Sequence, residues 1–503
     1  MSSFLIFLIT FFVYTVSLFF ISWRTSKKSN MTSYFRGDRK TPWAVVAYGM
    51  IGASLSGVTF ISVPGNVLAQ NWYYLPMVIG FIAGYAFIAE VLLPIYYKKN
   101  LNSIYSYLGD RFGLYSNKTA AFFFMISRLL GAAVRIFVVI IVFMTFIPSS
   151  SISEMGLFTI VAAIFLLFLY LYTYRGGVKT IIWTDVLQTT FMLLAVFISI
   201  YFIVDKMDWS FNDMFKSIFN AENPLIPGVK LSTSIDLNSS SATNFIKQFI
   251  SGAFVCIAMT GFDQTMMQKN LSCRDLKSAK KNMYSTSIII FLVNLLFLAL
   301  GIILTVYIFS NGGMDAFGIS KTDQMFPKVV SSLGVGITVI FLIGLISATY
   351  PSAGGAMTSL TSSFCIDFLH FDKRADLSVH TKEKMRKFIQ AIFALILLVI
   401  MCLLYILNNQ AVIVLVYKLA SYTYGPLLGI FFFGIFTNRD VNDKIIPWLA
   451  ISSPILCFLL NYIFKTFIGF EFGFCLLIVN ALLTFLGMFF ISKPSNNICK
   501  IAE

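Results

Sequence analysis

The segment at residues 344–369 combines the apolarity of a membrane helix with a run of hydroxyl side chains. Inside a bilayer, such oxygens either hydrogen-bond neighbouring helices or replace water around a small hard cation. Pro351 and the pair Gly354-Gly355 break helices, which is tolerated at membrane depth where the backbone is buried in protein or lines a cavity. Packing of small residues between helices is the alternative interpretation. The hydroxyl residues are Ser347, Thr349, Ser352, Thr358, Ser359, Thr361, Ser362 and Ser363.

Charged side chains in two other apolar segments indicate polar chemistry at membrane depth. Arg128 and Arg135 are seven residues apart, which places them on one face of a helix. An arginine in the bilayer costs at least a few kcal/mol unless it is paired or hydrated, so the pair predicts a functional cavity. A structural ion pair with Asp185 or Glu90 is the alternative. A buried Asp185 in turn needs a cation, whether a metal ion, a proton or an arginine.

The segment GMIGASLSGVTFISVPGN, near the start of the chain, contains both helix breakers and hydroxyl residues. A discontinuous helix at mid-membrane marks a transport site, because unwound carbonyls coordinate cations and half-helix ends face the solute. We therefore expect Ser56 and Thr59 to contact a solute, with tight helix packing as the alternative. The breakers are Gly49, Gly52, Gly57, Pro64 and Gly65.

The 503-residue chain is 58% hydrophobic and 12% charged, with a mean hydropathy of +0.83, which indicates a membrane protein with many spans. Membrane helices must therefore position these residues. About 13 apolar runs approach the ~20 residues that span a bilayer. The first lacks a cleavage-like site and predicts a retained helix. The runs cover residues 4–22, 43–68, 74–97, 119–147, 155–173, 180–204, 244–268, 284–309, 333–368, 388–408, 411–436, 446–464 and 472–492.

The distribution of basic residues predicts the orientation. With the N-terminus outside, most of the 37 Lys and Arg residues fall in cytoplasmic loops, as the positive-inside rule expects. The net charge of +15 is therefore largely a topology signal and does not indicate nucleic-acid binding. We expect a multi-pass protein of the plasma membrane, the inner membrane in bacteria, with a cytoplasmic C-terminus. The lysines left outside are Lys206, Lys216, Lys230, Lys321, Lys328 and Lys465.

The sequence gives poor support to an enzyme or an ATP-driven pump. The seven cysteines form no closely spaced pair, and the two histidines, His370 and His380, share one loop. Walker, nucleophile-elbow and zinc-protease motifs are missing. No cofactor is expected. Lys418 lies in an apolar span, where a lysine near the interface can snorkel to water. We expect the pair Gly425-Pro426 to break the helix of this span.

Four segments resemble signatures of the sodium:solute symporter family, which includes sodium-coupled sugar, sialate, proline, pantothenate and iodide carriers. They are TYRGGVKTIIWTDVLQT, FDQTMMQKNLSCRDLKSAKK, MTSLTSSFCIDF and YGPLLGIFFFGIF, and LSGVT in the second span adds to them. The resemblance covers residues from about 40 to 440 in the family's order. It implies an all-α, leucine-transporter-like fold in a single membrane domain, in which two inverted five-helix repeats each begin with a discontinuous helix.

The resemblance also implies where the two repeats and the segments that flank them begin and end. The repeats would span residues 43–204 and 244–436, separated by an extracellular loop at 205–243. An N-terminal helix and cytoplasmic loop at 1–42, together with C-terminal helices and a tail at 437–503, would flank them.

The resemblance further implies a sodium site between the broken helix and the hydroxyl-rich segment. Its ligands would be the carbonyls of Gly52 and Leu55, with Ala348, Pro351 and Ser352 opposite. Family members usually carry two adjacent hydroxyl residues where this chain has Pro351-Ser352. One sodium ligand is therefore missing from the family's pattern.

A second sodium site, found in some members, is not expected in this chain. The serines that form it match Gly354 and Gly355, although Asp185 matches the carboxylate near that site. We assign Asp185 to ion coupling or gating.

These observations predict a secondary active symporter that imports a small polar solute, such as a sugar, a sugar acid or another organic anion, with Na+ through the bilayer. The solute would bind between the broken helix, the helix of Arg128 and Arg135, and the spans that begin at residues 244 and 411. A cavity-facing Arg135 favours a sugar acid or another organic anion, since guanidinium matches carboxylate. The alternatives are a proton-coupled or uncoupled carrier, in which Asp185 titrates or Lys418 replaces the ion, and a transporter-derived receptor. The oligomeric state is left open, a monomer included.

Overall fold

The computed structural model describes residues 3–26, 41–99, 101, 103–147, 152–174, 177–371, 374, 376–407 and 412–494. Its first half consists of helices and one short hairpin. In chain order these elements are α1 Ser3–Ser26, α3 Trp43–Ser54, α4 Gly57–Gln70, α5 Leu75–Phe87, η1 Ile88–Leu92, α6 Leu93–Lys99, α7 Ser106–Arg111, α8 Leu114–Met144, α9 Glu154–Thr173, α10 Gly177–Lys206, α11 Phe211–Asn220, β1 Glu222–Asn223 and β2 Ile226–Lys230.

The second half continues as a helical bundle. Its elements are α12 Phe245–Cys256, η2 Ile257–Gly261, α13 Gln264–Leu271, α14 Leu276–Ser310, α15 Gly313–Ala316, η3 Thr322–Gln324, α16 Met325–Ser332, α17 Val335–Ser363, η4 Phe364–Phe368, α18 Val379–Leu407, α19 Val412–Phe436, β3 Arg439–Asp440, η5 Asp443–Ile445, α20 Ile446–Ile463, η6 Phe464–Ile468, η7 Gly473–Cys475, α21 Leu476–Ile491 and β4 Lys493–Pro494.

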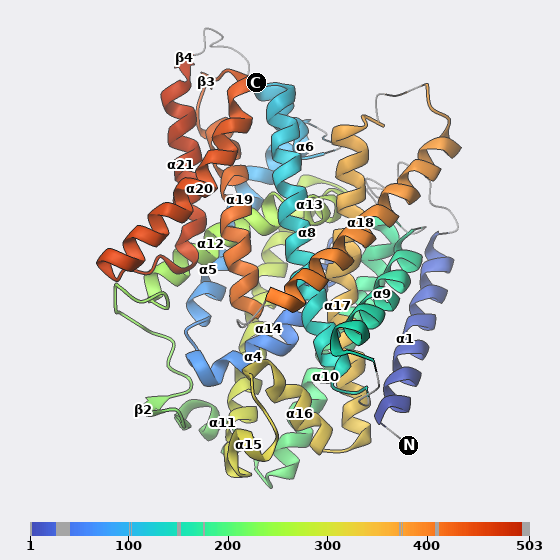
Figure 1. Cartoon of the computed structure of the whole chain (residues 1–503), viewed down its shortest axis with the longest axis vertical. Helices are drawn as coiled ribbons and strands as arrows, with labels where there is room; N and C mark the ends of the chain where they lie inside the picture. Colours follow the sequence, from blue (N-terminus) through green and yellow to red (C-terminus); the bar gives the residue numbers. More distant parts are fainter. Residues whose placement is uncertain are drawn as a thin grey trace.

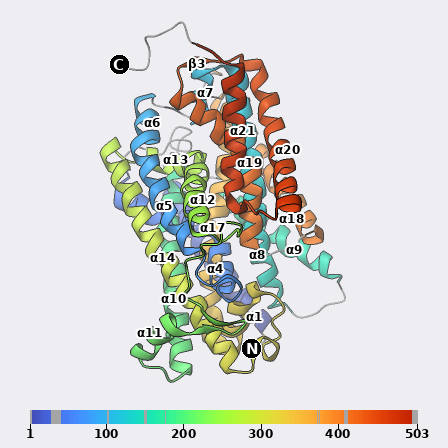
Figure 2. The same cartoon turned by 90° about the vertical axis from the view of Figure 1, so that its left-hand side faces the viewer.

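The bundle has the helices that a multi-pass membrane protein requires. Within the described residues, 10 unbroken helices are long and apolar enough to cross a membrane, and two bent pairs raise the number to 12. With the apolar helix α1, these are the spans expected from the sequence. α1 begins at one end of the bundle and α21 ends at the other (Figure 1), as expected for an odd number of spans. Figure 2 shows α5 beside α12, so helices from the two halves of the chain pack directly against each other.

Two helices are broken at the centre of the bundle, as the resemblance implied. α3 and α4 meet at an angle of 60°, and the helix Phe245–Gly261 meets α13 at 69°. The first break falls at Leu55, which is extended, and Ser56, whose N–H donates to Thr59 Oγ1 at 3.3 Å. At the second break, Asp263 caps α13 by accepting a hydrogen bond from Met266 N–H at 3.0 Å. Polar caps thus replace the hydrogen bonds that continuous helices would make.

The prolines do not break the helices in which they lie. α17 runs through Pro351 and the two glycines, and α19 runs through Pro426, which contradicts the predicted breaks in both segments. Pro64 and Gly65 lie inside α4, so the first break is shorter than the predicted one. Proline removes one helical hydrogen bond, and neighbouring helices in a membrane bundle compensate for that loss.

Connections between helices are hydrogen-bonded to the bundle at both of its ends. At the end of the bundle where α4 terminates, the side-chain amide of Asn223 donates to Leu68 O at 2.9 Å and to Asn71 Oδ1 at 2.8 Å. At the opposite end, Tyr105 donates through its hydroxyl to Phe262 O at 2.9 Å. Tyr107 donates to Gly434 O, also at 2.9 Å. The connection before α7 is thereby fixed against the second broken helix.

Candidate functional site

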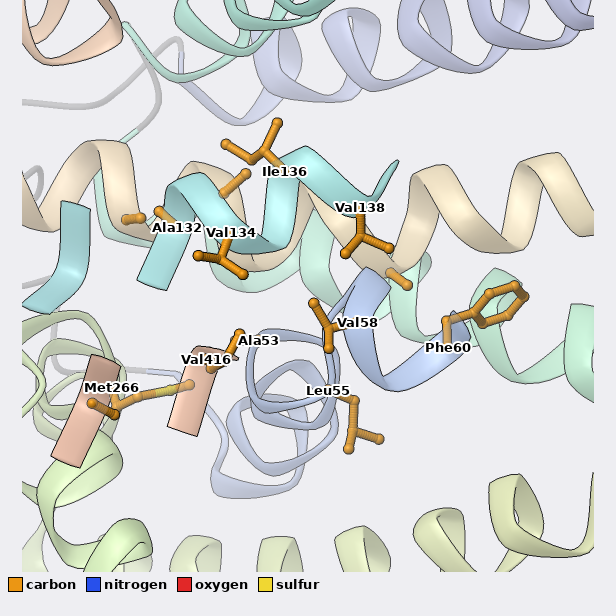
Figure 3. Packing of buried hydrophobic residues seen from close by; sticks show 14 of the residues in the cluster. Ala53, Leu55, Val58, Phe60, Ala132, Val134, Ile136, Val138, Met266 and Val416 are labelled. Carbon is orange, nitrogen blue, oxygen red and sulfur yellow. The ribbon is translucent and has the colours of Figure 1, made fainter. Parts of the chain in front are cut away.

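A cavity of about 90 Å³ lies where the first break meets helices from both halves of the chain. Its wall includes α8, the second broken helix, α14 and α19. Figure 3 shows Ala53, Leu55 and Val58 of the break between α8 and the segments that carry Met266 and Val416. The lining residues are Ala53, Ser54, Leu55, Ser56, Val58, Thr59, Tyr74, Phe81, Tyr85, Arg128, Arg135, Val255, Cys256, Met259, Thr260, Met266, Ile290, Asn294, Val416 and Tyr417.

The cavity collects all of the residues that the sequence assigned to a solute. Ser56 and Thr59 line it from the break, while Arg128 and Arg135 line it from α8. The spans that begin at 244 and 411 also contribute, as expected. The structure therefore brings this set together; the contact of its members with a solute stays a prediction.

The two arginines of α8 differ in their partners. Arg128 is 4% exposed, and its Nη1 lies 3.2 Å from Asp263 Oδ2. The alternative pairing of Arg128 with Asp185 or Glu90 is wrong, because the second break places Asp263 against α8. Within the described part of the chain, Arg135 makes no hydrogen bond or ion pair, although it is partly buried at the cavity wall. A cation in that position is available for an anionic ligand.

Asp185 is paired with a lysine that the sequence analysis missed. Lys269 Nζ lies 2.5 Å from Asp185 Oδ2, and the side chains are 1% and 0% exposed. Lys418, the lysine considered as a substitute for the ion, is instead exposed on α19. Lys269 was recognisable only as one of the basic residues after the Asp-Gln motif, because the sequence does not show that α13 turns inward.

Glu90, the other candidate partner of the arginines, lies in a different interaction. Its Oε2 lies 2.5 Å from Lys280 Nζ, and Tyr284 donates to its Oε1 at 2.9 Å. This pair joins η1 to α14 and is half exposed, so it lies outside the cavity wall.

The end of α3 packs closely against α10 and α17. A Cβ on Gly52 would lie 2.5 Å from Thr189 Oγ1 and 3.5 Å from Pro351 Cγ. One on Gly57 would lie 2.7 Å from Thr349 Oγ1. Only glycine permits these approaches, and Gly52 N–H donates to Thr189 Oγ1 at 3.1 Å. Thr189 is a hydroxyl neighbour of the break that the sequence analysis did not single out, whereas Thr349 belongs to the hydroxyl run at residues 344–369.

The residues predicted to bind sodium lie around this contact. The last carbonyls of α3 have no partner within that helix, because a helix end leaves its carbonyls free. Ser352 is 2% exposed and donates to Thr349 O at 3.1 Å, while Ala348 is fully buried. Over the described residues, no group of three His, Cys, Asp or Glu could hold a metal ion. Carbonyl and hydroxyl oxygens, which suit a hard cation, are the donors present here. The sodium assignment stays a prediction.

A broken helix in each half, with a polar cavity between them, defines a secondary transporter of the leucine-transporter fold. The profile of the sodium:solute symporter family matches residues 34–444, and the chain belongs to this family. Its activity is therefore the sodium-coupled transport of a solute across a membrane, not an enzymatic reaction.

Curated relatives are distant but cover most of the chain. The sodium/sialic acid symporter SiaT of Proteus mirabilis is 22% identical over 434 residues, 85% of this chain and 84% of its own length. The sodium/sialic acid symporter NanT of Aliivibrio fischeri is also 22% identical, over 86% of this chain and 83% of its own. The sodium-coupled monocarboxylate transporter 2 of Mus musculus is 21% identical over 70% of this chain and 55% of its own.

Solved structures confirm the fold. A substrate-bound, outward-open Na+-coupled sialic acid symporter superposes with a TM-score of 0.80 at 18% identity, covering 97% of this chain and 99% of that one. A nucleobase-cation-symport-1 family transporter in a closed conformation gives a TM-score of 0.53 at 14% identity, covering 92% and 96%.

Proposed function

We propose that this protein imports a carboxylate-bearing solute, such as a sialic acid, together with Na+. The observation that carries the proposal is Arg135, a cation at the cavity wall without a protein partner among the described residues. Guanidinium holds its charge at any working pH and presents a planar fork to a carboxylate. Relatives named for sialic acid and for monocarboxylates support an acid as the solute.

The remaining polar groups of the cavity suit a hydroxylated solute. Ser54, Ser56 and Thr59 approach from the break, while Tyr74 and Tyr417 share a hydrogen bond of 3.1 Å. Asn294 is 1% exposed, and its Oδ1 has no hydrogen-bond partner in the described structure. A carbonyl oxygen left in this way accepts hydrogen bonds from solute hydroxyl or amide groups. A sugar acid would use both the cation and these groups.

Sodium supplies the driving force through alternating access. A cation that enters down its gradient gains about 2.3 kcal/mol per charge at 100 mV, in addition to its concentration term. One Na+ with one monoanion carries no net charge, so only the concentration term would drive that cycle. We place the protein in the bacterial inner membrane with its N-terminus outside, as the distribution of basic residues predicts.

A thermal-shift assay on the purified protein tests the nature of the solute. A sialic acid, lactate and glucose are each added in NaCl and, separately, in choline chloride. We expect the sialic acid to raise the unfolding temperature in NaCl, and to do so much less in choline chloride. Stabilisation by glucose with no response to either acid would contradict an anionic solute.

The sodium assignment predicts a selective effect of Ser352→Ala. Because the hydroxyl is one of few ligands, the Na+ concentration for half-maximal uptake should rise about tenfold, which corresponds to roughly 1.4 kcal/mol. The matched control is Ser359→Ala, since Ser359 is equally buried and makes the same kind of bond, to Ala356 O at 3.1 Å. An unchanged Na+ dependence in Ser352→Ala would refute this ligand.

A further inference from the structure

We propose that α11, Phe211–Asn220, lies at the outer interface of the bilayer and contacts lipid through a row of phenylalanines. The partner of this surface is phospholipid, at the level where the acyl chains meet the headgroups. The inference concerns the loop between the two halves of the chain and does not depend on which solute or ion is carried.

The sequence builds α11 as a separate helix directly after α10. The chain leaves α10 through Asp208, whose φ of 51° is left-handed, and Trp209 N–H donates back to Val204 O at 3.1 Å. This arrangement ends a helix and turns the chain aside. A capping box then starts α11: Ser210 N–H donates to Asp213 Oδ2 at 3.1 Å, and Asp213 N–H donates to Ser210 Oγ at 3.2 Å. α11 is therefore fixed close to the end of α10.

The end of α10 marks the outer surface of the membrane. The segment Ile181–Lys206 is long and apolar enough to span a bilayer. Two of its aromatic side chains near the outer end, Phe197 and Tyr201, are 56% and 64% exposed, as lipid-facing residues are. Figures 1 and 2 both show α11 at the end of the bundle opposite β3. Its level is therefore that of the outer interface, where aromatic side chains are enriched in membrane proteins.

Two faces of α11 are apolar, and only one of them is turned into the protein. Met214 and Ile218 join the buried core on the side where α11 packs against α14. Beside them, Phe211, Phe215 and Phe219 recur every four residues, which places them on one face of the helix. These three side chains are 74%, 43% and 54% exposed, and successive ring centroids lie 4.8 Å and 6.5 Å apart. The row continues the lipid-facing surface of α10.

The third face of α11 is polar. A helix with protein on one side, exposed phenylalanines on the next and polar side chains on the third fits the place where protein, lipid and water meet. Asp213 and Lys216 carry opposite charges, so we assign the attraction to apolar contact with lipid and not to anionic headgroups. The exposed polar residues are Asn212, Asp213, Lys216 and Asn220.

This contact would also hold the connection that is docked on the first broken helix. α11 leads directly into the hairpin of β1 and β2, whose base is closed by Leu231 N–H donating to Ala221 O at 2.9 Å. In the same hairpin, Asn223 is 1% exposed and donates to the end of α4. An α11 held at the membrane surface therefore keeps this hairpin in position over α4.

The experiment puts a photoreactive benzoylphenylalanine in place of Phe215 in the full-length transporter, reconstituted in phosphatidylcholine vesicles. Under ultraviolet light this side chain bonds covalently to neighbouring C–H groups, and mass spectrometry of the protein identifies its partner. We expect phospholipid adducts. The matched control carries the same group at Asn220, which is exposed on the polar face of the same helix, and should give no adducts above an unirradiated sample.

Two outcomes of the cross-linking would overturn the proposal. Equal lipid adducts at both positions, or none at either, would show that the phenylalanine face has no particular contact with lipid. Adducts to a second protein chain at Phe215 would show that a protein covers this face.

A second measurement does not depend on the photoreactive group. Replacing Phe211, Phe215 and Phe219 together by serine should speed amide hydrogen exchange in α11 in vesicles, whereas Asn212→Ser should not. The three side chains are exposed, so the variant keeps its core and folds. Unchanged exchange in the triple variant would contradict the lipid contact. None of these results bears on the anionic solute, because no solute is present.

Discussion

Replacing Arg135 by glutamine should raise the apparent KM for a carboxylate solute about 100-fold, while Arg135→Lys should raise it about tenfold. A hydrogen bond to a charged group contributes about 1.5–3 kcal/mol, and 1.4 kcal/mol corresponds to a factor of ten. Glutamine loses the charge and the fork, whereas lysine loses only the second, parallel bond. Maximal rates should change less than affinities. Uptake by vesicles that contain each variant measures both quantities.

The specificity of this effect can be checked with the solute itself. The wild type should prefer the acid over its methyl ester, which presents no negative charge. The Arg135→Gln variant should lose that preference because its own side chain is neutral. If both variants kept the wild-type apparent KM, Arg135 would not contact the solute, and the argument for an anion would fail.

Replacing Asp263 by asparagine should destabilise the protein by about 3–5 kcal/mol, because it leaves the buried guanidinium of Arg128 without its counter-charge. Asparagine caps a helix as well as aspartate does, so the cap on α13 is retained and the lost charge is isolated. Thermal unfolding of the purified variant measures the loss. Adding Arg128→Met to Asp263→Asn should restore much of it, since the unpaired charge is then removed.

An exposed ion pair provides the matched control. Asp110 and Lys99 lie 3.6 Å apart with side chains 59% and 42% exposed. Asp110→Asn should therefore change stability by less than about 1 kcal/mol. If Asp263→Asn and Asp110→Asn lowered the stability equally, the pair of Arg128 and Asp263 would contribute no more than an exposed ion pair.

The membrane spans and the first break were predictable because their signals are local. Apolar length fixes a span, and the cluster of glycine, serine and threonine around Ser56 marks a place where a helix can stop. The helix breaks predicted at Pro351 and Pro426 were wrong, because a buried helix tolerates proline when neighbouring helices compensate for the lost hydrogen bond. The first and last residues of the two repeats stay a prediction.

The ion pairs were not predictable from the chain alone. Asp185, Glu90 and Asp263 were all chemically suitable partners for Arg128, and the choice depends on how the second broken helix packs against α8. Lys269 follows the Asp-Gln motif in the sequence and reads as part of a basic loop. Only the inward turn of α13 brings it to Asp185. The residue types do not reveal the predicted sodium ligands either, because every residue has a backbone carbonyl.

The most direct test of the central claim is uptake of a labelled sialic acid into vesicles that contain the purified protein. External NaCl is varied against choline chloride at fixed pH, with vesicles lacking the protein as the background. We predict uptake that saturates with Na+ and stops in choline chloride, with transient accumulation above equilibrium under an inward Na+ gradient. Equal uptake in both salts, or binding without accumulation, would contradict sodium-coupled import of this solute.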